Sequence, residues 1–129
     1  TDQNQGMAMS VLGNGLYHAG HVEDAMSVQE AELSMLRRVG ADEDQMLVTQ
    51  SNLAITYECL GRLEQALQMK RDVYAGRLRF NGEEDRDTLI SANNYATSLV
   101  GLKRFEEAKS LLRKTIPAAR RVFGAGHDG

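Results

Sequence analysis

Residues 53–66 read Leu-Ala-Ile-Thr-Tyr-Glu-Cys-Leu-Gly-Arg-Leu-Glu-Gln-Ala, and this stretch returns twice in altered form. Residues 95–108, 42 positions later, read Tyr-Ala-Thr-Ser-Leu-Val-Gly-Leu-Lys-Arg-Phe-Glu-Glu-Ala. Residues 12–25, 41 positions earlier, read Leu-Gly-Asn-Gly-Leu-Tyr-His-Ala-Gly-His-Val-Glu-Asp-Ala. Three copies at a nearly constant spacing indicate a chain built from stacked repeats.

Each copy places small and large residues at the same offsets. In the second copy Ala54 is small, Tyr57 is large one turn later, Gly61 marks a turn and Ala66 is small again. The first copy has Gly13, Leu16, Gly20 and Ala25 at these offsets, and the third has Ala96, Leu99, Lys103 and Ala108. Small residues facing large ones allow two helices to interdigitate, so each copy is predicted to be a helical hairpin.

The predicted helices end and begin at residues suited to helix termini. A Gly or Asn, which enters the left-handed conformation at low cost, follows an apolar residue in Val39-Gly40, Phe80-Asn81 and Phe123-Gly124. Acidic residues that can cap the next helix follow, namely Asp42 or Asp44, and Asp85 or Asp87. Six helices are predicted, at about residues 5–19, 21–39, 44–60, 62–80, 87–102 and 104–123. Pro117 should kink the sixth.

Composition narrows the class of protein. The chain of 129 residues is 42% apolar, contains one proline, and has no apolar run long enough for a membrane span. Its start lacks the basic and apolar regions of a signal peptide. Cys59 is the single cysteine, so no internal disulfide can form. We expect a globular helical protein in an intracellular, cytoplasmic setting, with no membrane partner.

Charge is unevenly distributed along the chain. Residues 1–44 carry a net charge of −6, whereas residues 86–129 carry +4. A patch for nucleic acid or an acidic peptide would involve Lys103, Arg104, Lys109, Arg113, Lys114, Arg120 and Arg121. These bases alternate with acids such as Glu106 and lack stacking aromatic residues, so a solvated surface is the favoured interpretation and no nucleic-acid partner is expected.

The repeated frame resembles the tetratricopeptide repeat (TPR), and its spacing is similar to the longer repeats of kinesin light chains. Asn52-Leu53-Ala54 with Tyr57, and Asn94-Tyr95-Ala96 with Leu99, resemble the Asn-Leu-Ala-x-x-Tyr that opens those repeats. Residues 123–128 resemble their Phe-Gly-x-x-His-Pro-Asp connector, without its proline.

The resemblance implies an all-α, right-handed superhelical solenoid of three helical hairpins, with six antiparallel helices. It implies a single domain over residues 1–129, with repeats at about 5–42, 43–84 and 85–126, and we expect this chain to be a fragment of a longer array.

The resemblance also implies a scaffold that binds a peptide or protein segment in a concave groove lined by first helices. The family's groove positions correspond here to Asn14, Val48, Ser51, Asn52, Ile55, Glu58, Ile90, Asn93, Asn94 and Thr97, with Met7, Ser10, Cys59 and Val100 beside them. Amides suit the backbone of an extended peptide because each offers both a donor and an acceptor. Asn52 and Asn94 could instead bond neighbouring helices. Capture of a chaperone C-terminus is disfavoured because the clamp lysine and arginine are missing from these positions.

Two alternatives remain open. The chain could be a structural spacer or a self-association module that stacks through its repeat ends, since the sixth helix presents Leu111, Leu112, Thr115, Ile116 and Ala119. A remote alternative is a metal-dependent enzyme using His18, His21 and Cys59 with Glu58 nearby, because zinc accepts such ligands. Without a recognised ligand spacing we expect no enzyme, no catalytic residues, no metal and no cofactor.

Overall fold

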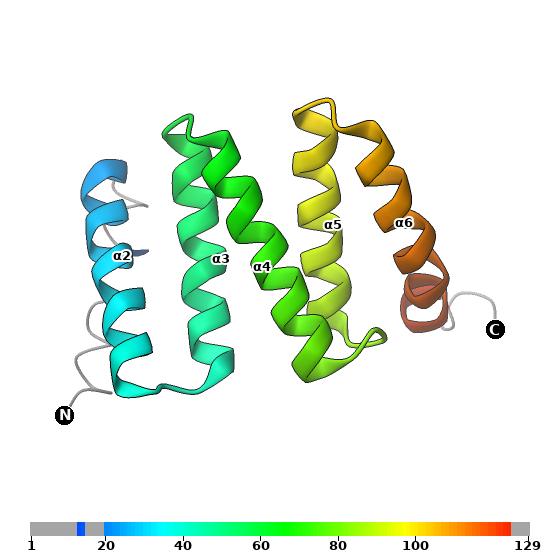
Figure 1. Cartoon of the computed structure of the whole chain (residues 1–129), viewed down its shortest axis with the longest axis horizontal. Coiled ribbons are helices and arrows are strands. Elements are labelled where there is room, and N and C mark those ends of the chain that lie inside the picture. The colour runs from blue at the N-terminus through cyan, green and yellow to red at the C-terminus, as the bar shows by residue number, and fades with distance from the viewer. Residues whose placement is uncertain (1–12, 15–19, 125–129) are drawn as a thin grey trace. The chain divides into compact units, whose positions relative to one another are not determined.

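The computed structural model describes residues 13–14 and 20–124, and those residues form helices joined by short turns (Figure 1). The helices are α2 (Val22–Val39), α3 (Glu43–Cys59), α4 (Leu63–Asn81), α5 (Arg86–Gly101) and α6 (Phe105–Ala119), followed by a π-helical turn, η1 (Arg120–Gly124). No strand occurs within these ranges. The prediction for α2 to α5 is confirmed to within one residue at each end. The first predicted helix lies almost entirely outside the described residues, of which Gly13 and Asn14 are helical.

The chain divides into two compact units, Thr1–Met69 and Lys70–Gly129, with the division inside α4. In the first unit the core includes a cluster of Leu33 from α2, Leu53 and Tyr57 from α3, and Ala66 from α4. In the second unit α5 and α6 pack against each other, burying Leu89, Ala92, Ala96 and Leu99 on α5 and Ala108, Leu111 and Ala118 on α6.

The small residues of the repeated frame lie where helices approach closely. Ala25, Ala54, Ala66, Ala96 and Ala108 are all at most 4% exposed. A Cβ added to Gly13 would lie 3.1 Å from the Cγ of Gln29 on α2, which is a tight contact. The small-against-large pattern therefore describes helix packing, as the sequence predicts.

Each hairpin turn in the described ranges contains a residue with left-handed backbone. Gly20, Gly61 and Lys103 have φ angles of 88°, 76° and 61°. In the second and third hairpins the turn closes with a bond from the following amide to a carbonyl near the helix end, Arg62 to Tyr57 at 2.9 Å and Arg104 to Leu99 at 2.8 Å. Lys103 adopts at some cost a conformation that glycine adopts freely.

Two of the predicted caps are made by the first acid of each candidate pair. The Asp42 carboxylate accepts from the amide of Gln45 at 2.8 Å. Asp85 accepts from the amides of Asp87 and Thr88 at 2.9 and 3.2 Å. These bonds satisfy amides that the first turn of a helix leaves without partners, which explains why α3 and α5 begin where they do.

The predicted helix ends are right in one case out of three. Gly40 takes the left-handed conformation after α2, with φ of 69°. Asn81 instead belongs to α4, and Gly82 (φ 89°) takes that conformation, because glycine bears no Cβ and tolerates it better than asparagine. Gly124 lies within η1 and does not end the helix in this way.

The η1 turn absorbs one extra residue. Phe80 and Phe123 are 43 positions apart, although the repeated stretches are 42 apart. A π-helical turn spans one more residue per hydrogen bond than an α-helical turn, so it accommodates the insertion.

Pro117 lies inside α6 and removes the bond to the Arg113 carbonyl. The irregularity begins three residues after this proline rather than at it, and Figure 1 shows the ribbon turning away from the α6 axis there.

Candidate functional site

One face of α3 exposes apolar side chains between polar ones. Val48 and Ile55, seven residues apart, are 43% and 45% exposed. Ser51, Asn52 and Glu58 lie on the same face and are half-buried. The opposite face contains Leu47, Leu53, Ala54 and Tyr57, all buried in the first unit. Because helical residues three, four and seven apart share a face, α3 presents the predicted groove positions outward as one continuous stripe.

A corresponding face exists on α5. Ile90 and Val100 are 49% and 48% exposed, and Asn93, Asn94 and Thr97 between them are exposed as well. The Thr97 hydroxyl donates to the carbonyl of Asn93 at 2.8 Å and so stays within its own helix. In each unit the predicted first-helix positions are therefore brought together on one accessible surface. We call the α3 and α5 stripes the first-helix faces.

Asn14, the predicted position in the first repeat, is helical and half-buried. Met7 and Ser10 lie outside the described residues.

The bonds between neighbouring repeats are made by other residues than Asn52 and Asn94. In the first unit the Thr56 hydroxyl and the Gln29 side-chain oxygen are 2.7 Å apart. In the second unit Lys70 donates to the Ser98 hydroxyl at 2.7 Å, and these two residues occupy the repeat positions equivalent to Gln29 and Thr56. Over the described part of the chain, the side-chain amides of Asn52 and Asn94 make no hydrogen bond. The amides are therefore available to a ligand. Among the described residues, Asn52 and Asn94 do not bond neighbouring helices through their side chains.

These bonds between repeats were not predicted from the sequence. Thr56 and Ser98 fall at equivalent offsets with a hydroxyl in both copies, and that shared chemistry was the signal that could have identified them. A second bond in the first unit joins the Thr49 hydroxyl to the Glu32 carboxyl group, both of which are buried.

The first-helix faces carry almost no charge. Glu58 is the one ionisable acid among the predicted groove residues, and none of them is a lysine or arginine. A surface of amides, hydroxyls and aliphatic side chains favours backbone hydrogen bonds and apolar contacts over ion pairing with a ligand.

The residues of the metal alternative are not gathered in the structure as far as it is described. His21 and Cys59 are exposed, and His18 lies outside the described residues. Within the described ranges no three His, Cys, Asp or Glu side chains are placed to hold a metal ion.

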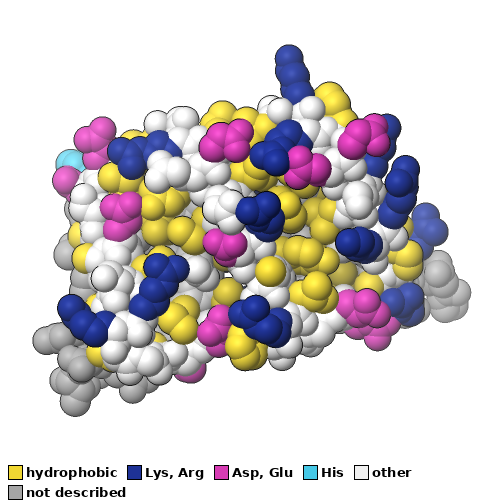
Figure 2. Space-filling view, in the orientation of Figure 1, with side chains coloured by type: hydrophobic (Ala, Val, Ile, Leu, Met, Phe, Trp, Pro, Cys, Tyr) yellow, Lys and Arg dark blue, Asp and Glu magenta, His cyan; other side chains and the backbone are white. Residues whose placement is uncertain are grey.

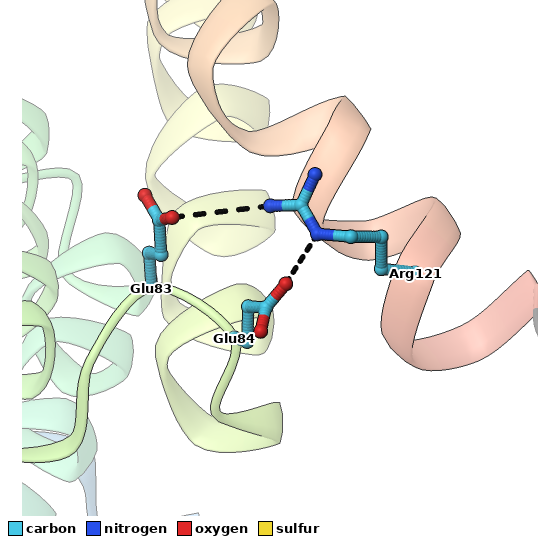
Figure 3. Close-up of polar contacts among 3 residues, drawn as sticks. All are labelled: Glu83, Glu84 and Arg121. Carbon is cyan, nitrogen blue, oxygen red and sulfur yellow. Dashed lines mark hydrogen bonds and ion pairs between the residues drawn. The ribbon is translucent and has the colours of Figure 1, made fainter.

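The basic end of the chain is interleaved with acids. Figure 2 shows Lys and Arg side chains over the α6 part of the surface with Asp and Glu side chains among them. Arg104 pairs with Glu107 at 2.8 Å and Lys109 with Glu106 at 3.4 Å. Arg121 on η1 contacts Glu83 at 3.8 Å and also pairs with Glu84, so both glutamates of the α4–α5 loop face this guanidinium (Figure 3).

None of the described helices has the length and apolar character of a transmembrane helix.

Comparison with known families decides the classification. The tetratricopeptide repeat family matches residues 4–79, and a second tetratricopeptide repeat match covers residues 88–128. The chain belongs to the tetratricopeptide repeat family. None of the curated proteins compared gives a significant match.

Solved structures support the same TPR fold. BtubC (BKLC) from P. vanneervenii is 23% identical, with a TM-score of 0.72 over 90% of this chain and 46% of that protein. A Podosopora anserina protein assigned as a kinesin light chain, with nearly identical TPR-like repeats, is 20% identical, with a TM-score of 0.73 over 88% of this chain and 54% of that one. A second structure of the Podosopora anserina repeats is 18% identical, with a TM-score of 0.79 over 95% of this chain and 58% of that one.

This TPR chain therefore spans about half the length of these relatives. The predicted fold, an all-α TPR solenoid with repeats of the kinesin-light-chain kind, is confirmed. TPR repeats generally mediate protein–protein interactions, and TPR folds typically serve as non-enzymatic scaffolds.

Proposed function

We propose that this TPR chain binds a peptide or protein segment along its first-helix faces, in the concave groove that the resemblance implies, without catalysing a reaction. The observation that carries the proposal is the combination, on α3 and again on α5, of exposed aliphatic side chains with amides that make no hydrogen bond among the described residues. The aliphatic groups supply apolar contact, and the amides pair with backbone groups that would otherwise lose their hydrogen bonds on binding. A cytoplasmic setting is part of the proposal.

A capture experiment tests this proposal. Ile55 or Ile90 is replaced by a photo-crosslinking amino acid, and the captured proteins are compared with those from a variant carrying the same group at Ala75, which is exposed on α4. Partners should be captured through Ile55 and Ile90, and Asn52→Ala with Asn94→Ala should reduce their yield, whereas Asn81→Ala, at the exposed end of α4, should not. Equal capture from Ala75, or no loss with the paired asparagine variant, would contradict the proposal.

A second candidate function is stacking through the repeat end, and the burial of α6 favours it. Leu112, Thr115 and Ala119 are half-buried, and Ile116 is 42% exposed, whereas Leu111 is buried. The equivalent residues of α2, which are Gln29, Glu32, Leu33 and Leu36, are all at most 4% exposed. A face that is covered in one repeat is thus open in another, so we propose that a further helix covers it, from another repeat of a longer array or from a second molecule.

A further inference from the structure

A hollow of about 290 Å³ lies in the first unit between α2, α3 and the start of α4. Leu33, Leu53 and Tyr57, each at most 6% exposed, form its floor, and half-buried Met69 forms one side. The exposed side chains at its rim are Glu30, Ser34 and Arg37, which lie along one line of α2. No residue of the first-helix faces lines the hollow, so it is a separate surface.

The hollow depends on the size of two side chains. The second unit has Tyr74 and Tyr95 at the repeat positions of Leu33 and Leu53, and their rings are 6.2 Å apart, centre to centre. Leucine is smaller than tyrosine, so the equivalent site in the first unit is left with apolar walls and unfilled space. The site therefore distinguishes one pair of repeats from the other.

The charges around the hollow are unequally compensated. The Tyr57 hydroxyl donates to Glu30 at 2.7 Å, and burial together with this bond raises the pKa of Tyr57 to about 12, so it remains a neutral donor. The positive charge of Arg62 partly lowers the pKa of the Tyr57 hydroxyl, so a cation lies near this hydroxyl and the Glu30 carboxylate to which it is bonded. The Arg37 guanidinium, at the other end of the rim, makes no hydrogen bond or ion pair with any described residue. Among the described residues, this cation therefore lies uncompensated beside an apolar floor.

We propose that this hollow is a second binding site, which takes one large apolar side chain of a partner protein while a carboxylate on the same segment pairs with Arg37. The volume lies at the lower limit for small-molecule pockets, about 300 Å³, and suits one anchoring side chain of a protein interface. The hollow is open to solvent along α2, so a segment can lie across its rim. Arginine matches the planar geometry of a carboxylate and stays charged throughout the physiological range.

The first experiment uses the methyl group of Met69 as a reporter inside the hollow. The protein is labelled with methyl-13C methionine, the Met69 resonance is assigned with Met69→Leu, and three blocked hexapeptides are titrated. Their central pairs are Phe-Asp, Ala-Asp and Phe-Lys between flanking Gly-Ser residues. The Phe-Asp peptide should shift the Met69 resonance and should bind at least about tenfold more tightly than the other two, a difference of about 1.4 kcal/mol.

Matched variants separate this site from its surroundings. Ser34→Trp should cover the hollow and abolish the Met69 response, and Arg37→Glu should reverse the preference toward Phe-Lys. Arg38→Glu is the control, because Arg38 is the exposed neighbour that does not line the hollow. Equal binding by Ser34→Trp, or equal effects of Arg37→Glu and Arg38→Glu, would overturn the proposal.

The first-helix faces are tested in the same titration. The Phe-Asp peptide could lose binding in Asn52→Ala with Asn94→Ala and keep it in Ser34→Trp. That result would place the peptide on the first-helix faces, which overturns this site and leaves the proposed function standing. The converse pattern would support the hollow and say nothing against the first-helix faces, so the two failures are distinguishable.

Discussion

Glu32 is a buried side chain whose carboxyl group is only partly hydrogen-bonded. It is 1% exposed, one oxygen accepts from the Thr49 hydroxyl, and the other oxygen has no partner. Burying a polar atom without a hydrogen bond costs stability, and the cost rises when the remaining partner is removed. The equivalent residues in the second repeat pair are Val73 and Ser91, so a carboxyl group is not needed for the helices to pack at this position.

The pair Glu32 and Thr49 should therefore respond to substitution in a strongly coupled way. Thr49→Val removes the hydroxyl but keeps the shape, and should lower the free energy of unfolding by about 1–3 kcal/mol because Glu32 loses its partner. Adding Glu32→Met should recover most of that loss, since a flexible apolar side chain then fills the interface. Denaturant titration of both single variants and the double variant measures the coupling. Additive losses would show that the bond contributes nothing specific.

The buried hydroxyl of Tyr57 should make stability depend on alkaline pH. Its pKa is about 12 in the folded chain against 10.0 as the ordinary value, so folding favours the protonated form. The contribution is complete below about pH 10 and is lost as the pH rises to about 12, and it amounts to at most about 3 kcal/mol. Tyr57→Phe should lose less stability than the original chain between these pH values. Parallel denaturation curves for the two proteins across this window would refute the assignment.

At the scale of elements, the three hairpin turns differ in a way that can be measured. Lys103 holds a left-handed conformation where the other two turns have glycine. Lys103→Gly should stabilise the chain by about 0.5–1 kcal/mol, less than the full cost of left-handed backbone because glycine is also more flexible when unfolded. Lys109→Gly, inside α6, is the matched control and should lower stability by about 1 kcal/mol. Melting temperatures that fall in both variants would contradict the prediction.

The helices were predictable from the sequence wherever a local signal marks their ends. Asp42 and Asp85 are caps, and Gly20, Gly40 and Gly61 enable turns, so boundaries near them agree with the structure. The choice between Asn81 and Gly82 was predictable only in part, because glycine favours the left-handed conformation but both residue types adopt it at helix ends and both follow the last apolar residue. The η1 turn was visible only as a spacing of 43 instead of 42, and a single inserted residue does not show whether a loop or a helix absorbs it.

The two proposed binding surfaces were predictable to different extents. The first-helix positions followed from the resemblance together with helical periodicity, and the structure brings the described ones onto common faces. The hollow was not predictable, because it depends on how Leu33 and Leu53 pack against Met69 from another helix. The only sign of it in the sequence is that two leucines in one pair of copies correspond to two tyrosines in the other pair. That difference can be interpreted only when the structure shows that the members of each pair lie together.

At the scale of the whole molecule, a second helix that is covered by the next repeat forms a hydrogen bond to that repeat. Gln29 in the first unit and Lys70 in the second each bond to a hydroxyl on the following first helix. The equivalent residue of α6 is Leu112, which carries no polar group and is half-buried. Together with exposed Ile116, it forms an apolar stripe. Burying this stripe against another helix would be favourable, because it removes apolar surface from water.

We therefore expect the chain to self-associate through α6 as its concentration rises. A contact between unlike surfaces would give end-to-end stacks, whereas a contact of α6 with its symmetry mate would stop at a dimer. Leu112→Glu with Ile116→Glu should lower the mass measured by light scattering at high concentration, because charges on the stripe would have to be buried without partners. Ser110→Glu with Lys114→Glu, at exposed positions on the other side of α6, is the control and should leave the mass unchanged. A monomer at every concentration tested would mean that solvent alone covers the stripe in this chain, and equal effects of both pairs would mean that added negative charge, not the stripe, controls association.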